Sequence, residues 1–100
     1  MATLGKKIQN HNAVVGTAQS TILPAGTAAC EGGQILIQNA HTSANVFIGL
    51  AADTSLSTTT RNGWWLAPGA GLVLDNPANS AITAISDTSN TPVTVYSIDV

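Results

Sequence analysis

The sequence contains a single cysteine, and this excludes several kinds of site. With Cys30 alone, no disulfide forms within the chain, and neither an all-cysteine zinc site nor a CxxC redox motif is possible. The simplest interpretation is synthesis in a cytoplasm. Residues 1–12 hold two lysines and a polar stretch but no apolar run, so they do not resemble a secretory signal. The longest apolar stretch, Val46–Ala52, is far shorter than the roughly 20 residues of a membrane helix.

Charged side chains are also scarce. They make up 8% of the chain, whereas about 25% is usual for a soluble domain. A surface of uncharged polar groups gives little repulsion between copies, which suits a subunit packed against neighbours. The lysine and arginine residues are Lys6, Lys7 and Arg61, and the chain has five carboxylate side chains. Because phosphate binding needs clustered Lys and Arg, we expect no nucleic-acid partner.

Aromatic residues reach only 4%, so the core must be built from Val, Ile, Leu and Ala. A chain of 100 residues forms one domain and buries only about two thirds of the surface that its unfolded form exposes. Its core is therefore thin, and contacts with partners would add much to its stability.

Short apolar runs separated by Pro, Gly and Asn turn signals predict an all-β fold. We expect a small antiparallel β-sandwich, jelly-roll-like, of about eight short strands over residues 13–100. It follows an extended N-terminal arm, residues 1–12, which should be protease-sensitive and dispensable for folding. The strands are expected near Ala13–Thr17, Ser20–Leu23, Gln34–Asn39, Asn45–Leu50, Trp64–Leu66, Gly71–Asp75, Ala81–Ser86 and Val93–Asp99.

Alternation along these strands predicts which side chains form the core. The inward set is Ile35, Ile37, Val46, Ile48, Leu72, Leu74, Ile82, Tyr96 and Ile98, and the outward polar set is Gln34, Gln38, Thr83, Thr94 and Ser97. The opposite faces also carry apolar residues, namely Leu36, Phe47, Val73 and Val95. A single small sandwich cannot cover both faces of a strand, so this pattern predicts self-association or a partner.

The chain offers little that could perform chemistry. The carboxylates are scattered singly, no Gly-x-Ser-x-Gly motif or Gly-rich phosphate loop is present, and we expect no enzyme, no cofactor and no metal site. His11 and His41 stand in polar stretches of the sequence. A histidine in such a stretch is more often an exposed side chain than a metal ligand.

The adjacent indoles of Trp64 and Trp65 are the best candidates for a site. In a strand they point to opposite faces, so we expect one to lie in the core and the other on the surface. Three roles stay open for the outward indole: cover for a loop of the same chain, an anchor at a subunit interface, or a platform on which a sugar stacks.

A family resemblance also enters at these residues. It is carried by Ile37-Gln38-Asn39, then Asn45–Gly49, a Ser/Thr-rich loop, Asn62-Gly63, Leu66–Ala70 and Leu72–Asp75, and it continues to Ala84–Ser86 and Val93–Tyr96. Over residues 13–100 the chain resembles small virion proteins of tailed bacteriophages. Such proteins are β-sandwiches that decorate or cement the capsid, commonly as trimers, while others belong to head fibres or tails.

The resemblance implies a non-enzymatic capsid decoration protein on the virion surface. It would be made in the host cytoplasm, form a homo-oligomer with a trimer favoured, and bind the major capsid protein. The residues expected at subunit or capsid interfaces are Trp64, Trp65, Lys6, Lys7 and Arg61. The alternative is a carbohydrate- or host-binding module of a head fibre or tail, which would stack a glycan on Trp64 or Trp65.

Overall fold

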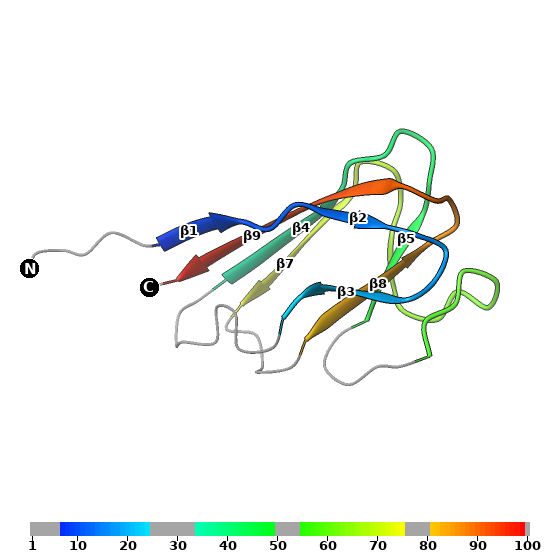
Figure 1. Cartoon of the computed structure of the whole chain (residues 1–100), viewed down its shortest axis with the longest axis horizontal. Helices are drawn as coiled ribbons and strands as arrows, with labels where there is room; N and C mark the ends of the chain where they lie inside the picture. Colours follow the sequence, from blue (N-terminus) through cyan, green and yellow to red (C-terminus); the bar gives the residue numbers. More distant parts are fainter. Residues whose placement is uncertain (1–6, 25–33, 50–54, 76–80, 100) are drawn as a thin grey trace, which may run out of the picture.

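The computed structural model describes residues 7–24, 34–49, 55–75 and 81–99. Every regular element within these ranges is a β-strand (Figure 1). In chain order the strands are β1 (Lys7–Asn10), β2 (Ala13–Val15), β3 (Ser20–Leu23), β4 (Gln34–Asn39), β5 (Val46–Gly49), β6 (Trp64–Leu66), β7 (Gly71–Asp75), β8 (Ile82–Ser86) and β9 (Thr91–Asp99). No helix in the described ranges is long and apolar enough to span a bilayer.

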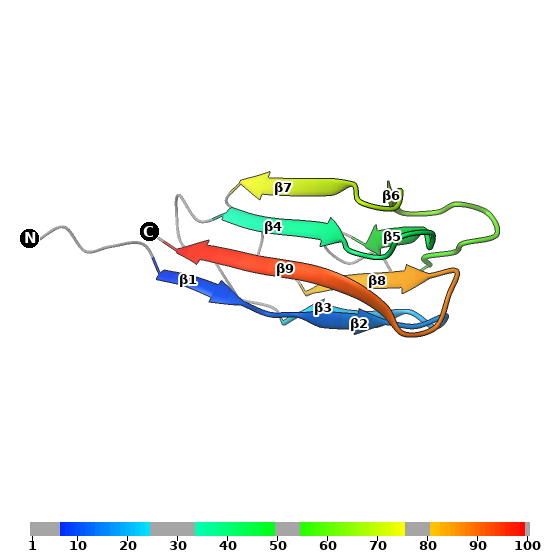
Figure 2. The same cartoon turned by 90° about the horizontal axis from the view of Figure 1, so that it is seen from above.

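The strands form two antiparallel sheets. One sheet has the order β1-β9-β4-β7, with β2 also pairing with β9, and the other has the order β3-β8-β5-β6. In Figure 2, β9 runs along much of the length of the molecule, and β1 and β2 follow one another along its edge. Core side chains come from both sheets, which makes the fold a small β-sandwich.

The strand pairing is nested. The pairs are β1 and β2 with β9, β3 with β8, β4 with β7, and β5 with β6. The chain is therefore one long hairpin that is rolled up so that β4 also meets β9 and β5 also meets β8. With β1 and β2 counted as one interrupted strand, this is the eight-stranded jelly-roll arrangement. The prediction of an all-β, jelly-roll-like sandwich is confirmed.

The core consists of aliphatic side chains, as the low aromatic content predicts. It contains Val15, Ile22, Leu23, Ile35, Ile37, Val46, Ile48, Leu66, Ile82, Ala84, Val93 and Val95. Leu72 and Leu74 of the edge strand β7 are partly buried against it. The predicted inward set is thus correct for β4, β5, β7 and β8.

Strand β9 has the opposite phase from the prediction. Its buried side chains are Thr91, Val93, Val95 and Ser97. Tyr96, predicted to point inward, is 37% exposed, and Ser97, predicted to point outward, is buried. Both alternate sets along β9 contain large apolar side chains, so alternation alone cannot choose between them. His11 also differs from its predicted exposure: it is partly buried, and its Nε2 lies 2.7 Å from Ser97 Oγ, which gives that buried hydroxyl a partner.

Strand β1 lies inside the segment predicted as an arm. Lys7–Asn10 pairs with β9 in a register that places Ile8 opposite Ile98. This part of the segment is a strand of the first sheet, although the sequence predicts an unpatterned and dispensable tail. Residues 1–6, including Lys6, lie outside the described residues.

Asn39, at the end of β4, ties the two sheets together. Its side chain is fully buried, and its Nδ2 donates to the carbonyl oxygens of Ala44 at 2.7 Å and Leu66 at 3.0 Å. Its Oδ1 accepts the backbone N–H of His41 at 3.0 Å. Both polar ends of the amide are therefore satisfied, which a buried polar side chain requires.

A second, smaller apolar cluster lies on the other face of β5. Phe47 packs there with Leu56 and Ile85. Gly63 closes the loop beside them, because a Cβ at this position would lie 2.7 Å from Leu56 Cδ2 and 3.2 Å from Phe47 Cβ. Its φ of +126° also lies in the region that favours glycine. Phe47, predicted on the non-core face of β5, is buried beneath this loop.

We predict that Asn39→Asp lowers the free energy of unfolding by about 3–5 kcal/mol at neutral pH. The variant keeps the shape but replaces two donated hydrogen bonds with a buried carboxylate facing two carbonyl oxygens. Urea unfolding measures the loss, which should shrink in acid, where a protonated carboxyl can donate again. Asn12→Asp makes the same charge change at an exposed site and should stay within about 0.5 kcal/mol of the parent. Equal unfolding midpoints for the two variants would contradict this role.

Three glycine-to-alanine variants should fall in a fixed order of stability. Gly16→Ala should be close to neutral, because nothing lies within 4 Å of its added Cβ. Gly69→Ala meets no atom either, but its φ of +80° should cost about 1–2 kcal/mol. Gly63→Ala combines positive φ with steric overlap and should cost about 2–5 kcal/mol. Thermal unfolding ranks the three, and a Gly63→Ala protein as stable as Gly16→Ala would refute the packing described here.

Candidate functional site

Trp64 and Trp65 occupy the edge strand β6. Trp64 stands opposite Ile48 and Trp65 opposite Phe47, so the two indoles leave the strand on opposite faces, as predicted. Neither is in the core, however: they are 53% and 51% exposed. The expectation of one buried indole is therefore wrong. Strand β6 spans only three residues and has a sheet neighbour on one side only, so little of the protein is placed to cover either ring.

The loop between β5 and β6 positions Arg61. Ser57 and Asn62 form a β-bridge through two backbone hydrogen bonds of 3.1 and 3.0 Å. The amide of Asn62 further donates to the backbone and side-chain oxygens of Ser55. Arg61 sits within this tight turn at a φ of +57°, which is uncommon for a residue with a Cβ. The turn brings its guanidinium to 5.2 Å from the centre of the Trp65 ring, a cation–π contact.

A second contact holds Trp65 through its indole N–H group. Its indole Nε1 donates to Asn45 Oδ1 at 3.0 Å. Asn45 is held in turn by Asp87, which accepts the Asn45 side-chain amide at 3.0 Å and its backbone N–H at 3.1 Å. The four side chains form a chain of contacts, Arg61–Trp65–Asn45–Asp87, which we call the Trp65 cluster.

Asp87 is the electrostatic end of the Trp65 cluster. The hydrogen bond from the Asn45 side chain is the main reason why the pKa of Asp87 lies below the ordinary value of 3.8. Partial desolvation opposes this shift, and further hydrogen bonds from backbone N–H groups and Thr88 add to it. The carboxylate is therefore charged at neutral pH and accepts from Asn45. Sequence reasoning missed both residues. The pairing of β5 with β8 would have indicated that these two residues are neighbours, because Asn45 and Asp87 flank the paired residues Val46 and Ser86.

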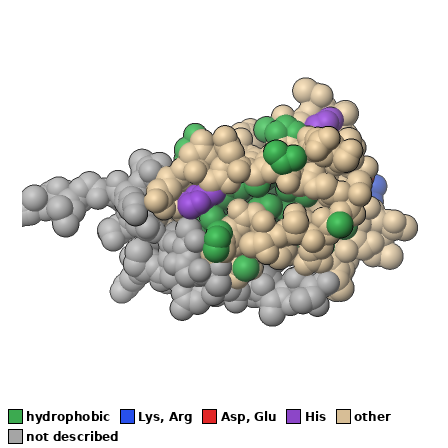
Figure 3. Space-filling view, viewed as in Figure 1, with side chains coloured by type: hydrophobic (Ala, Val, Ile, Leu, Met, Phe, Trp, Pro, Cys, Tyr) green, Lys and Arg blue, Asp and Glu red, His purple; other side chains and the backbone are tan. Residues whose placement is uncertain are grey.

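A separate apolar area covers the outer face of the first sheet. Tyr96, Leu36 and Val73 stand side by side on β9, β4 and β7. Val73 is 56% exposed, and the three residues border a shallow groove. Figure 3 shows a different side of the molecule, with the β1–β2 and β3 edges in front, and this side too carries scattered green apolar patches in a mostly uncharged surface. The predicted outward placement of Leu36 and Val73 is correct.

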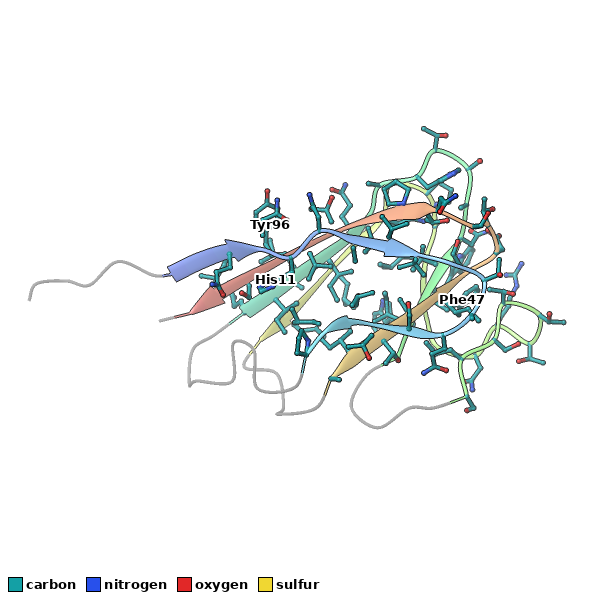
Figure 4. The ribbon with its side chains drawn as sticks, viewed as in Figure 1. His11, Phe47 and Tyr96 are labelled. Carbon is teal, nitrogen blue, oxygen red and sulfur yellow. The ribbon has the colours of Figure 1, made fainter. Side chains whose placement is uncertain are left out.

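The other described candidates are not members of the Trp65 cluster. Lys7 is in β1, which Figure 2 places at the opposite end of the molecule from β6. Figure 4 shows His11 near the junction of β1 and β2, far from Phe47 beneath the loop. His41 uses its Nδ1 to accept backbone N–H groups of Ser43 and Ala44, both at 2.9 Å, which is a turn-forming role. Within the described ranges, no three His, Cys, Asp or Glu side chains gather as metal ligands do.

Comparison with known proteins adds no relative. No protein-family model matches the chain. No curated protein matches it, and no solved structure does.

We predict that the Trp65 cluster loosens in acid. Because the pKa of Asp87 is lowered by folding, the stabilisation from its carboxylate is present at neutral pH and is lost as the pH falls through the pKa of the folded state. In a Trp64→Phe background, the fluorescence of Trp65 should change on titration from about pH 7 to about pH 2, with a midpoint below 3.8. Asp87→Asn in the same background should abolish the transition. An identical transition in both proteins would show that protonation of Asp87 does not cause the change at Trp65.

Proposed function

We propose that this chain is a non-enzymatic structural protein of a bacteriophage virion, a decoration protein that binds the lattice of the major capsid protein. The observation that carries the proposal is the pair of half-exposed indoles at the edge strand β6. A binding role explains why two such large apolar groups stay accessible to water in a chain with few aromatic residues.

The Trp65 cluster has the physical character of an interface anchor. Tryptophan and arginine are enriched among the residues that contribute most to protein association. Trp65 is held by Asn45 and Arg61 before any partner arrives, so binding costs little side-chain entropy. We therefore assign Trp64, Trp65 and Arg61 to the capsid-binding surface.

The rest of the surface supports assembly into a larger particle. With few charged groups, the protein meets little electrostatic repulsion from copies and neighbours. Jelly rolls occur in viral capsid domains and in lectins, so the fold is compatible with both proposed functions and chooses neither. The resemblance over residues 13–100 favours the virion. In this proposal the protein is made in the host cytoplasm, ends on the capsid surface, and needs no cofactor, nucleic acid or membrane.

The basic residues near the N-terminus have a separate role in this proposal. Lys7 begins β1, which lies at the opposite end of the molecule from β6 (Figure 2), and Lys6 precedes it in the sequence. We assign them to attraction toward an acidic neighbour, a contact that added salt should weaken.

A glycan-binding module of a head fibre or tail is the second candidate. The exposed indoles beside amide and carboxylate groups favour it, because sugars stack on aromatic rings and hydrogen-bond to such groups. The geometry of the Trp65 cluster opposes it. Arg61 lies over the Trp65 ring, and the polar groups of Asn45 and Asp87 already bind each other and the indole N–H. Protein binding is therefore the better supported function.

The test is co-sedimentation of the purified protein with capsids of the phage that encodes it. Trp65→Ala and Trp64→Ala should each weaken attachment by about 2–4 kcal/mol, or about 30- to 900-fold in Kd, because the anchor is lost. Since both rings are half exposed, neither variant should open a core cavity, and both should melt close to the parent.

Val14→Thr is the matched control, because it makes an exposed apolar side chain of the other sheet polar. It should bind capsids normally. A glycan array probed with all proteins separates the two functions. Normal capsid attachment by both tryptophan variants would overturn the decoration proposal, and glycan binding that is lost only in those variants would establish the second candidate.

A further inference from the structure

The edge strands of the two sheets are not protected to the same degree. An exposed edge offers unpaired backbone groups to any other strand, and proteins limit this with bulges, interruptions, short strands, prolines or charges. Strand β3 contains a register shift between Thr21 and Leu23, and β6 has only three residues. The edge formed by β1 and β2 is interrupted at His11 and Asn12.

Strand β7 has the fewest of these protections. Its five residues, Gly71–Asp75, pair with β4 in an unbroken register. It contains no proline and no lysine, and its one charged residue is the terminal Asp75. Among the described strands it is therefore the edge best prepared to accept another strand.

The ladder direction shows which backbone groups of β7 are open. The N–H of Asn39 donates to the carbonyl of Ala70 at 2.9 Å, so residues 39 and 70 form a hydrogen-bonded pair. In an antiparallel ladder such pairs alternate with non-bonded pairs. The backbone of Leu72 and Leu74 then faces β4, and that of Val73 faces the open side. Val73 thus offers a free edge N–H and C=O together with a side chain that is 56% exposed.

We propose that β7 pairs with β7 of a second copy, antiparallel and about a two-fold axis through Val73. The two first sheets would then join into one continuous sheet. In this register Val73 faces Val73 of the second copy, and Leu72 faces its Leu74.

The sequence of β7 is complementary to itself in this register. Gly71 faces Asp75 of the second copy, so the two acidic residues stand at opposite ends of the paired strands and not at opposed positions. The row Tyr96–Leu36–Val73 meets the same row of the second copy. An uncharged apolar band then runs across β9, β4 and β7 of both copies, and its two halves need no charged partner. These features favour a second copy over an unrelated strand.

The inference does not depend on the proposed capsid function. A two-fold contact is isologous and joins copies in pairs, whereas the trimer implied by the resemblance needs a heterologous contact elsewhere. Where the β7 contact alone links two units, its loss should therefore halve the mass of the assembly.

The first experiment removes the open N–H of β7. Val73→Pro deletes a group that does not bond to β4, and edge strands tolerate proline at such positions. The matched control is Val14→Pro. The N–H of His11 donates to Val95 O, and by the same alternation the N–H of Val14 faces away from β9. The masses are measured by sedimentation equilibrium from micromolar to millimolar concentration. The parent protein and Val14→Pro should each have twice the mass of Val73→Pro.

A second pair of variants tests the register without a proline. Val73→Lys and Val73→Glu each place like charges opposite one another across the two-fold axis, so each alone should lose the pairing. An equimolar mixture should regain it as a one-to-one complex, because Lys then faces Glu.

The outcomes separate this inference from the capsid proposal. Halved mass in Val73→Pro and rescue by mixing support the β7 contact whether or not capsids bind the protein. Equal masses for the parent and Val73→Pro, or no rescue in the charge-swapped mixture, overturn it even if capsid attachment is normal. Circular dichroism of each variant confirms folding. If Val73→Pro does not fold, the mixing experiment decides alone.

Discussion

The buried amide of Asn39 sets the geometry on which the rest of this structure depends. It leaves the end of β4 in one sheet and binds the carbonyl of Leu66 in the other. The same amide binds the carbonyl of Ala44. Ala44 and Leu66 are the sequence neighbours of Asn45 and Trp65, which form the hydrogen bond at the centre of the Trp65 cluster. The buried hydrogen bonds of Asn39 therefore fix the two backbone segments that carry Asn45 and Trp65. This gives the exposed indole of Trp65 a defined orientation.

A thin aliphatic core accounts for where the binding surfaces lie. The two sheets share one layer of buried side chains, so the outer face of the first sheet carries Tyr96 and Val73 in contact with solvent. On the second sheet, Leu56 covers Phe47, but β6 stays open. The exposed indoles and the bare β7 edge are thus two separate surfaces. One serves the proposed attachment to a capsid and the other the proposed contact between copies, so both contacts can form at once.

The sequence was most informative where only one face of a strand is apolar or where turns have distinct chemistry. Alternation placed Ile35, Ile37 and Ile82 in the core, and the turn signals located most strands. It failed on β9, where Val95 and Tyr96 are both large and apolar and only packing against neighbours decides the phase. The Trp65 cluster was only partly predictable. Its indole and Arg61 stand out in the sequence, but Asn45 and Asp87 become neighbours only once β5 and β8 are paired.

The nested pairing of the strands has a consequence for synthesis. Ile8 pairs opposite Ile98, so β1 finds its partner only after residues 9–97 have been synthesised. At common translation rates this takes about 5–20 s. During that time the N-terminal strands have no ladder to join, and folding of such non-local pairs is intrinsically slow. We therefore expect the unpaired N-terminal strands of a nascent chain to be open to strand exchange with neighbouring nascent chains during this interval.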